Sequence, residues 1–369
     1  MARSSEVLVI GAGPAGIASA IAARLKGFEV TVADFRRPPI DKACGEGLLP
    51  EGVSALRRLG IYFPPDFAHP FFGLRFRDPI YSASALFPGG PALGIRRTAL
   101  HKLLLARAEE LNISFLWGAR LTALSRNSVR LNQELISYKW LVGADGHDSQ
   151  VRKFAGLDSR WRKTSRLGFR RHFEISPWSN VAEVYWGGRF QIVVTPTGCN
   201  ELCLSLFTSD SRLRLREAIA AFPALSERLR CASALDLELG SVTSLRSASA
   251  PARGRVALVG DASCTVDGIA GQGLSLAFQQ AHALADAIAA NDLPRYAAAH
   301  RSITRNARRM TRLLLLMNNS PWIRAKTLRL FAAKPALFSR MISLHAGAAT
   351  GQSVGVREVL HLTLEVLGA

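Results

Sequence analysis

Cysteine is scarce in this sequence, and long uncharged hydrophobic runs are absent. Five cysteines occur in 369 residues, and no two of them have C-x-x-C spacing. This pattern excludes a disulfide framework and a zinc module, so we expect reduced thiols in a cytosolic protein. The longest uncharged apolar stretch, residues 7–23, is interrupted by three glycines and a proline. With roughly 17 residues it is at the lower limit for a membrane span, so we expect a soluble protein without a targeting segment.

Acidic residues are also few, since 47 Lys and Arg oppose 28 Asp and Glu and give a net charge of +19. The excess favours anionic partners, namely a nucleotide, an acidic substrate, a membrane surface or nucleic acid, and charge alone does not choose among them. The hydrophobic content of 48% is that of a globular protein and excludes a disordered or coiled-coil chain. The length suits two packed domains.

The beginning of the chain predicts a β-α-β unit around a glycine-rich turn. A buried apolar strand over 6–10 is followed by a helix over 14–26 and a second strand over 28–33. In the turn, Gly11 permits the sharp bend, Gly13 lets the backbone approach a pyrophosphate, and Gly16 lets the helix pack on the strand. Asp34 follows the last glycine after 18 residues, a position that suits a ribose ligand but would repel a 2′-phosphate. An ordinary glycine-rich turn is the alternative interpretation.

Two later segments also place an aspartate at the end of a buried strand. The first is Gly143-Ala-Asp145-Gly146, and the second is Gly260-Asp261-Ala262, which is followed by Gly271-Gln272-Gly273 at the start of a predicted helix. Taken singly, each aspartate is equally consistent with a turn or a helix cap. Three strand-ending motifs in this order are much harder to attribute to chance.

With these three motifs the chain resembles the FAD-dependent monooxygenase superfamily of the p-hydroxybenzoate hydroxylase type. The resemblance covers the chain to about residue 290. It implies bound FAD, with NAD(P)H as a transient electron donor, because no second G-x-G-x-x-G motif is present. The residues that the resemblance assigns to FAD binding are Gly11, Gly13, Pro14, Ala15, Gly16, Asp34, Cys44, Gly45, Arg97, Asp145, Gly260, Asp261, Gly271, Gln272, Gly273 and Leu274.

Within that superfamily, the segment from Lys42 to Pro50 looks closest to the geranylgeranyl-reductase-like branch. There a Cys-Gly pair lies beside the flavin, so Cys44 is a catalytic candidate; a small buried residue in a tight loop is the alternative. The sequence departs from the family at Asp267-Gly268, where a proline is usual. The resemblance therefore leaves the geometry of this loop open. The absence of a Trp-x-Trp-x-Ile-Pro run argues against a tryptophan-type halogenase.

The predicted fold class is α/β (α+β overall): a Rossmann-like FAD-binding domain, an inserted mostly antiparallel substrate sheet and a helical C-terminus. Alternating segments over 164–208 predict the sheet, and a basic helix is predicted over 211–230. In the sheet, His172 and Tyr185 are the catalytic candidates, although alternation lets only every second residue face a cofactor. The predicted domains are an FAD-binding domain over 1–70, 96–163 and 245–295, a substrate domain over 71–95 and 164–244, and a C-terminal region over 296–369.

The segment 301–340 contains basic residues and no acid, and its first half has the periodicity of a basic amphipathic helix. Such a helix packs on its own domain with a solvated basic face, or it contacts an anionic membrane surface or an acidic carrier protein. We therefore expect a cytoplasmic protein, with peripheral contact to the inner membrane face as one option. Nucleic-acid binding is not expected, because no series of base-stacking aromatic residues accompanies the charge.

Three functions are consistent with the sequence. The favoured one is a monooxygenase that uses NAD(P)H and O2 to hydroxylate or epoxidise an apolar small molecule, aromatic or polyketide-like. The second is a geranylgeranyl-reductase-like flavin reductase of C=C bonds in prenyl or lipid substrates. The third is a non-catalytic, FAD-containing membrane or carrier interaction protein. Substrate-dependent O2 consumption and anaerobic saturation of a double bond separate the first two functions.

Overall fold

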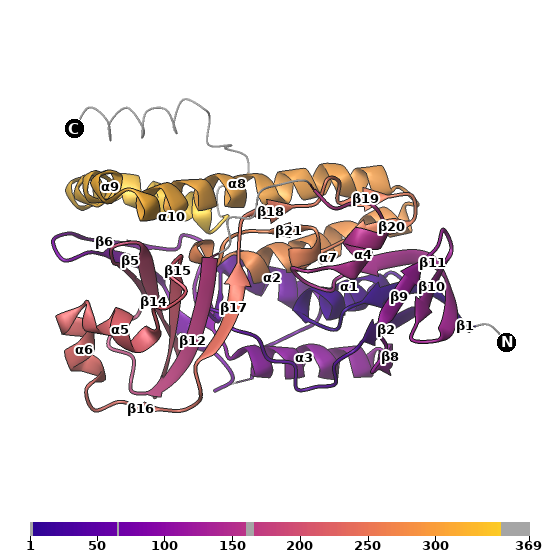
Figure 1. Cartoon of the computed structure of the whole chain (residues 1–369), viewed down its shortest axis with the longest axis horizontal. Coiled ribbons are helices and arrows are strands. Elements are labelled where there is room, and N and C mark those ends of the chain that lie inside the picture. Colours follow the sequence, from indigo (N-terminus) through magenta and orange to yellow (C-terminus); the bar gives the residue numbers. More distant parts are fainter. Residues whose placement is uncertain (1–2, 65, 160–165, 348–369) are drawn as a thin grey trace.

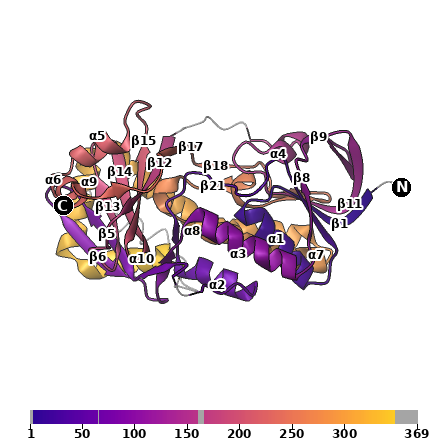
Figure 2. The ribbon, with the colours of Figure 1, turned by 90° about the horizontal axis from the view of Figure 1, so that it is seen from below.

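The computed structural model describes residues 3–64, 66–159 and 166–347. Two large sheets lie next to each other along the long axis of the molecule (Figure 1), with a layer of C-terminal helices extending across both, and two small sheets of two and three strands accompany them. The view from below shows the first helices of the chain packed under one of the two sheets (Figure 2). This arrangement confirms the predicted α/β fold class with an additional antiparallel sheet and a helical C-terminus.

The first sheet is mostly parallel and has the order β19-β20-β11-β1-β2-β8. Its central strands are short runs of buried, often β-branched residues, as parallel strands covered on both faces require. The helices α1, α2, α3 and α7 pack on one face of this sheet. Strand β10 pairs with β11 and β9 pairs with β10, and their side chains pack on the other face. The bounds are β1 Arg3–Ile10, α1 Pro14–Leu25, β2 Val30–Asp34, α2 Pro50–Arg58, α3 Arg97–Glu110, β8 Ser114–Trp117, β9 Leu121–Leu124, β10 Ser128–Leu131, β11 Glu134–Gly143, α4 Gln150–Phe154, β19 Ala252–Arg253, β20 Val256–Leu258 and α7 Gly273–Ala289.

The second sheet is mostly antiparallel and has the order β16-β12-β15-β14-β13-β5-β6, with β17 also paired to β12. Alternating side chains give it two buried faces, as predicted from the sequence pattern. One face packs on the C-terminal helices and the other on α5 and α6. The bounds are β5 Gly73–Arg77, β6 Ser82–Leu86, β12 Arg166–Glu174, β13 Ala182–Trp186, β14 Phe190–Gly198, β15 Glu201–Thr208, α5 Leu215–Ala220, α6 Pro223–Leu229, β16 Ser233–Ala234 and β17 Leu239–Thr243.

Up to residue 347, where the described part of the chain ends, three helices follow α7, and each of them has proline in its first turn: α8 Leu293–Asn319, α9 Pro321–Ala333 and α10 Pro335–His345. The predicted basic amphipathic helix lies in α8, whose buried face includes Ala307, Leu314 and Met317. Short elements complete the chain: β3 Gly47–Leu48, β4 His69–Phe71, β7 Ala92–Gly94, β18 Arg246–Ser247, η1 Gly260–Ala262, β21 Cys264–Thr265 and η2 Gly268–Ala270. None of the described helices combines the length and the apolar character that a membrane crossing requires.

The single basic helix predicted over 211–230 is wrong. The segment forms two short helices, α5 and α6, which are separated at Phe222. Pro223 provides the reason, because its ring cannot continue a helix but fits the first position of a new one. The predicted domain boundaries remain a prediction.

Candidate active site

Nearly all of the predicted cofactor residues line one cavity of about 970 Å³. It lies at the carboxyl ends of the parallel strands, and residues from the antiparallel sheet and the C-terminal helices complete its wall. The carboxyl edge of such a sheet is the usual place for a nucleotide. The predicted residues in its wall are Gly11, Gly13, Pro14, Ala15, Asp34, Cys44, Gly45, Arg97, Asp145, Gly260, Asp261, Gly271, Gln272, Gly273 and Leu274.

The glycine-rich turn between β1 and α1 has the geometry that the sequence predicted. A side-chain Cβ at Gly11 would lie 2.4 Å from the Ala144 carbonyl oxygen, and one at Gly16 would lie 1.8 Å from the Gly11 carbonyl oxygen. Gly16 therefore allows close packing of the helix on the strand and does not line the cavity. A Cβ at Gly13 would meet nothing within 4 Å, so this position leaves the approach to the α1 amides open for an anion.

Asp34 lies at the end of β2 with its carboxylate directed to the turn. Its Oδ2 accepts a hydrogen bond from the Ala12 amide at 2.7 Å, and Oδ1 accepts one from the Arg36 amide at 2.8 Å. A carboxylate has about four acceptor positions, so lone pairs remain for the hydroxyl groups of a ribose.

The carboxylate of Asp145 has a structural role that the sequence left open. It accepts hydrogen bonds from the Ser149 hydroxyl and from the amides of Gln150 and Val151, which begin α4. Burial raises its pKa, and these hydrogen bonds oppose the shift. Asp145 thus caps a helix, while its position in the cavity wall keeps it and Gly146 beside any ligand.

The third motif forms the wall on the side of α7. The carboxylate of Asp261 lies 3.3 Å from the Lys42 amine, and both side chains are about one-third exposed. Gly271 adopts the left-handed conformation with φ of 62°, and side chains added at Gly271 or Gly273 would meet nothing within 4 Å. The amides at the start of α7 are therefore accessible from the cavity and offer positive partial charge to a ligand.

Buried polar atoms without partners provide a further test of whether FAD fits. Arg97 and Gln272 both line the cavity. The Nε atom of Arg97 and the Oε1 atom of Gln272 are buried and have no hydrogen-bond partner among the described residues. Buried polar groups are normally paired, so two unpaired ones in one wall indicate a polar ligand. Together with the open positions at Gly13, Gly271 and Gly273, these atoms fit a dinucleotide such as FAD.

The Cys44 loop joins the cofactor side of the cavity to the antiparallel sheet. Cys44 is half-buried in the cavity wall, and its Sγ accepts a hydrogen bond from the Glu46 amide at 3.4 Å. Glu46 is buried in the left-handed region with φ of 56°. One of its carboxylate oxygens accepts a hydrogen bond from the Arg97 amide, and the other contacts His172 Nε2 at 2.5 Å. Sequence reasoning missed Glu46, and no motif assigned a role to its side chain.

His172 supports this loop and does not line the cavity. Its two ring nitrogens contact the carboxylates of Glu46 and Asp236, the latter at 2.6 Å. Burial by itself would lower the pKa of His172, but the hydrogen bonds and charge of the two acids outweigh it and raise the pKa. His172 is thus connected to Cys44 through Glu46, whose amide donates to Cys44 Sγ, and Asp236 is a partner that the sequence did not reveal.

Tyr185 lies on the opposite face of the sheet, away from the cavity. Its hydroxyl donates a hydrogen bond to Glu183 at 2.6 Å, and its ring packs against Phe222. Burial, together with the Glu183 carboxylate, raises its pKa further above the ordinary value. The structure thus does not bring Tyr185 to the other candidates; the alternation of β13 directs Ala182 and Val184 to the cavity instead.

The part of the cavity farthest from the glycine turn is apolar, and the sequence did not predict its composition. Met310 and Leu314 of α8 are four residues apart on one helix face, a spacing that is visible in the sequence. Other walls come from the sheet, the β4 region and α10: Phe71, Leu74, Phe76, Ala182, Val184, Val193, Phe207, Met341 and Ile342. This apolar chamber is continuous with the predicted cofactor site.

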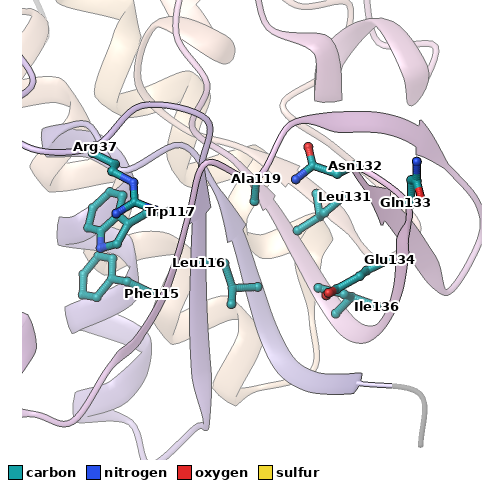
Figure 3. Close-up of a pocket in the computed structure, with 10 residues that line it drawn as sticks. All are labelled: Arg37, Phe115, Leu116, Trp117, Ala119, Leu131, Asn132, Gln133, Glu134 and Ile136. Atoms are coloured by element: carbon teal, nitrogen blue, oxygen red, sulfur yellow. The ribbon is translucent and has the colours of Figure 1, made fainter.

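A second hollow of about 680 Å³ lies beside β8, at the edge of the parallel sheet (Figure 3). The stacked rings of Phe115 and Trp117 lie on one side of it, and the turn between β10 and β11 lies on the other. None of the predicted site residues lines this hollow, so we assign the function to the larger cavity.

Comparisons with known proteins agree with this geometry. Residues 4–183 match the model of the FAD binding domain family. The chain is 30% identical over 338 residues to 3-hydroxy-4-methyl-anthranilyl-[aryl-carrier protein] 5-monooxygenase of Streptosporangium sibiricum, covering 84% of this chain and 87% of the relative. It is 27% identical to menaquinone reductase of Mycobacterium tuberculosis, covering 79% of this chain and 78% of the relative.

Solved structures share the whole fold. A flavoprotein/dehydrogenase from Cytophaga hutchinsonii superposes with a TM-score of 0.80 at 18% identity. The superposition covers 99% of this chain and 100% of the Cytophaga chain. A geranylgeranyl bacteriochlorophyll reductase-like protein from Thermoplasma acidophilum gives 0.72 at 18% identity, covering 100% of this chain and 98% of its own. At these identities the likeness concerns the fold alone.

The cofactor prediction is confirmed by the family match, and NAD(P)H is the electron donor typical of these monooxygenases. The carrier-protein monooxygenase relative is similar over most of both chains. The chain therefore belongs to the FAD-dependent monooxygenase superfamily of the p-hydroxybenzoate hydroxylase type and is an FAD-dependent oxidoreductase.

Proposed function

We propose that this protein is a monooxygenase that uses NAD(P)H and O2 to hydroxylate or epoxidise an apolar small molecule, aromatic or polyketide-like. The observation that carries the proposal is the single cavity in which the glycine-rich cofactor wall continues into an apolar chamber. FAD, when bound, supplies the hydride and oxygen chemistry, whereas the protein supplies binding, orientation and electrostatics.

The residues in the wall divide this work. The α1 amides beyond Gly13 and the Asp34 carboxylate would hold the nucleotide half, and Arg97 and Gln272 offer unpaired polar atoms to the cofactor. The amides of Gly273 and Leu274, at the start of α7, stabilise negative charge that develops beside them. The apolar side chains of the chamber exclude water from the reacting groups.

Oxygen and product measurements on the FAD-loaded protein test the proposal. We expect NADH or NADPH to be oxidised with O2 uptake that depends on an apolar aromatic or polyketide-like compound, and we expect the product to contain one oxygen atom from 18O2. A protein that binds FAD but incorporates no label from 18O2 with any member of such a panel would contradict the proposal.

The alternative is reduction of a C=C bond in a prenyl or lipid substrate. Cys44 in the cavity wall favours it, as does the similarity to a protein named menaquinone reductase. Under strict exclusion of O2, a reductase saturates the bond with NAD(P)H, whereas a monooxygenase gives no product. The same two assays thus separate the candidates.

The partner predicted for 301–340 remains a proposal. Arg301, Arg305 and Arg312 are exposed on α8, opposite its buried face. One relative, by its name, acts on a substrate attached to an aryl-carrier protein. We propose a small apolar molecule as the substrate, whether free or carried; an acidic carrier protein or an anionic membrane surface would meet this basic face.

A further inference from the structure

Asp267 belongs to the Asp267-Gly268 pair, at which the sequence lacks the proline usual in its family, and the structure places it in the cavity wall. It follows β21 and directly precedes η2, the turn that leads to Gly271 and α7. Its side chain is 1% exposed. An acid at this depth requires an explanation, because buried carboxylates are costly unless they are paired.

Contacts within the protein account for the burial of one carboxylate oxygen of Asp267. Oδ1 accepts a hydrogen bond from Arg166 Nη1 at 2.7 Å and one from the Ile269 amide at 3.1 Å, which caps η2. Arg166 in turn donates to the side chain of Gln191 and to the Phe207 carbonyl group, so the ion pair ties the turn to the antiparallel sheet. These contacts are what a purely structural acid would make.

The second oxygen has no such explanation. Within the described residues, no hydrogen bond is made to Asp267 Oδ2. The Phe207 ring lies beside the next residue, Gly268, and Met310 and Leu314 contribute apolar side chains to the same cavity. Burial raises the pKa of Asp267, and Arg166 opposes this shift. An acceptor with a free lone pair, enclosed in an apolar chamber, suits a ligand that carries a hydrogen-bond donor.

We propose that Asp267 is a specificity-determining residue whose Oδ2 accepts a hydrogen bond from a hydroxyl or amino group of the substrate. This inference rests on the proposed function, because it places the substrate in the apolar chamber. Asp267 then selects molecules that present a donor hydrogen next to the 268–274 segment, and it orients the ring or chain that bears this group. An equivalent molecule with a methyl ether at that position leaves Oδ2 unpaired and binds more weakly.

The replacement Asp267→Asn tests the proposal through a reversal of preference. If the amide oxygen takes over the contacts of Oδ1, the amide nitrogen replaces Oδ2 and presents a donor where the wild-type protein presents an acceptor. The probes are matched hydroxy and methoxy compounds: phenol with anisole, 2-naphthol with 2-methoxynaphthalene, and 1-hydroxypyrene with 1-methoxypyrene. Binding is followed through the change in flavin absorbance of the FAD-loaded protein, without NAD(P)H, so that no turnover is needed.

In the wild-type protein we expect the hydroxy member of at least one pair to bind about ten-fold or more tightly, as one hydrogen bond to a charged group provides. In Asp267→Asn we expect the ratio of the affinity for the hydroxy compound to the affinity for the methoxy compound to fall below one. Because loss of the carboxylate leaves Arg166 unpaired, the double variant Asp267→Asn with Arg166→Gln provides a neutral pair for the same measurement. Flavin content and melting temperature establish that each variant is folded.

The matched control is Glu183→Gln, which removes another buried, arginine-paired carboxylate that lies outside the cavity. It should lose stability and keep the wild-type ratio. A wild-type protein that shows no preference in any pair, or folded Asp267 variants that keep the wild-type ratio, would overturn the inference. Failure of the proposed function is distinguishable, since it appears as absence of substrate-dependent O2 uptake while the binding preference remains.

Discussion

At the residue scale, Gly13 gives the most direct test of the cofactor site. A side chain at this position has open space and ordinary backbone angles, with φ of −73° and ψ of 175°. Gly13→Glu should therefore fold, while its carboxylate occupies the approach to the α1 amides and repels the pyrophosphate. We expect loss of more than nine-tenths of the bound FAD, measured as the ratio of flavin to protein absorbance.

The control for this change is Gly188→Glu, an exposed glycine that also has open space and lies outside the cavity. It adds the same charge and should keep the FAD. Unchanged flavin content in folded Gly13→Glu protein would contradict the assigned position of the pyrophosphate.

His172 makes a prediction about pH. Its pKa is raised in the folded protein, so its contribution to stability is complete below the unfolded value of about 6.5 and is lost as the pH rises through the folded pKa. His172→Gln removes the shorter cationic contact of the buried Glu46 and leaves only Arg170, whose Nη1 lies 3.8 Å from the other carboxylate oxygen, so it should cost about 1–3 kcal/mol at pH 6. Urea unfolding at several pH values should show this difference shrinking above neutral pH. A constant difference would indicate that His172 is not charged in the folded protein.

The same residues show how far the sequence reached at this scale. The glycines and Asp34 could be predicted because each meets a local requirement of a turn or a phosphate. Glu46 and Asp236 could not, because their role depends on His172, which is more than 60 residues from either of them along the chain. Pairings over such separations leave no spacing to recognise.

At the element scale, α10 determines the size of the apolar chamber. Met341 lines the cavity, whereas Phe338, one turn earlier, is buried against Phe76 and Phe331 and does not. Met341→Ala should cost about 2–3 kcal/mol and enlarge the chamber, so that probes with one more ring bind more tightly. Phe338→Ala should cost about 3–5 kcal/mol without this change in preference. The affinities of both variants for the smaller and larger probes are measured by flavin absorbance titration. If Met341→Ala and Phe338→Ala prefer the larger probes equally, α10 does not bound the substrate site.

Elements with a strong local signal were predicted well, and those whose orientation depends on tertiary contacts were not. The alternating segments over 164–208 predicted the antiparallel sheet, and β13 lies within this range. Which of its faces meets the cavity was not predicted: alternation defines two faces, and only packing against α5, α6 and α10 distinguishes them. For this reason Tyr185 could be named as a candidate although it lies on the face that packs against α5 and α6.

At the scale of the whole molecule, the sequence correctly indicated that three distant turns converge on one site. Each turn follows a parallel strand, and the carboxyl ends of parallel strands share one edge. It did not indicate that α8 and α10 close the far end, because their packing on the second sheet has no local signature beyond amphipathicity.

This arrangement predicts that FAD stabilises both halves of the molecule together. The cavity wall combines the parallel sheet, the antiparallel sheet and the C-terminal helices, so a ligand in it contacts groups from each. With FAD at 100 times its dissociation constant, the free energy of unfolding should exceed that of the apoprotein by about 2.7 kcal/mol. Urea unfolding followed by far-UV circular dichroism and by tryptophan fluorescence should shift equally, since Trp117 and Trp140 lie in the first sheet and Trp186 in the second. The Gly13→Glu protein should show no shift with added FAD. Because both signals report on both sheets, an unfolding curve that splits into two steps, of which FAD shifts only one, would mean that the shared cavity does not couple the two sheets.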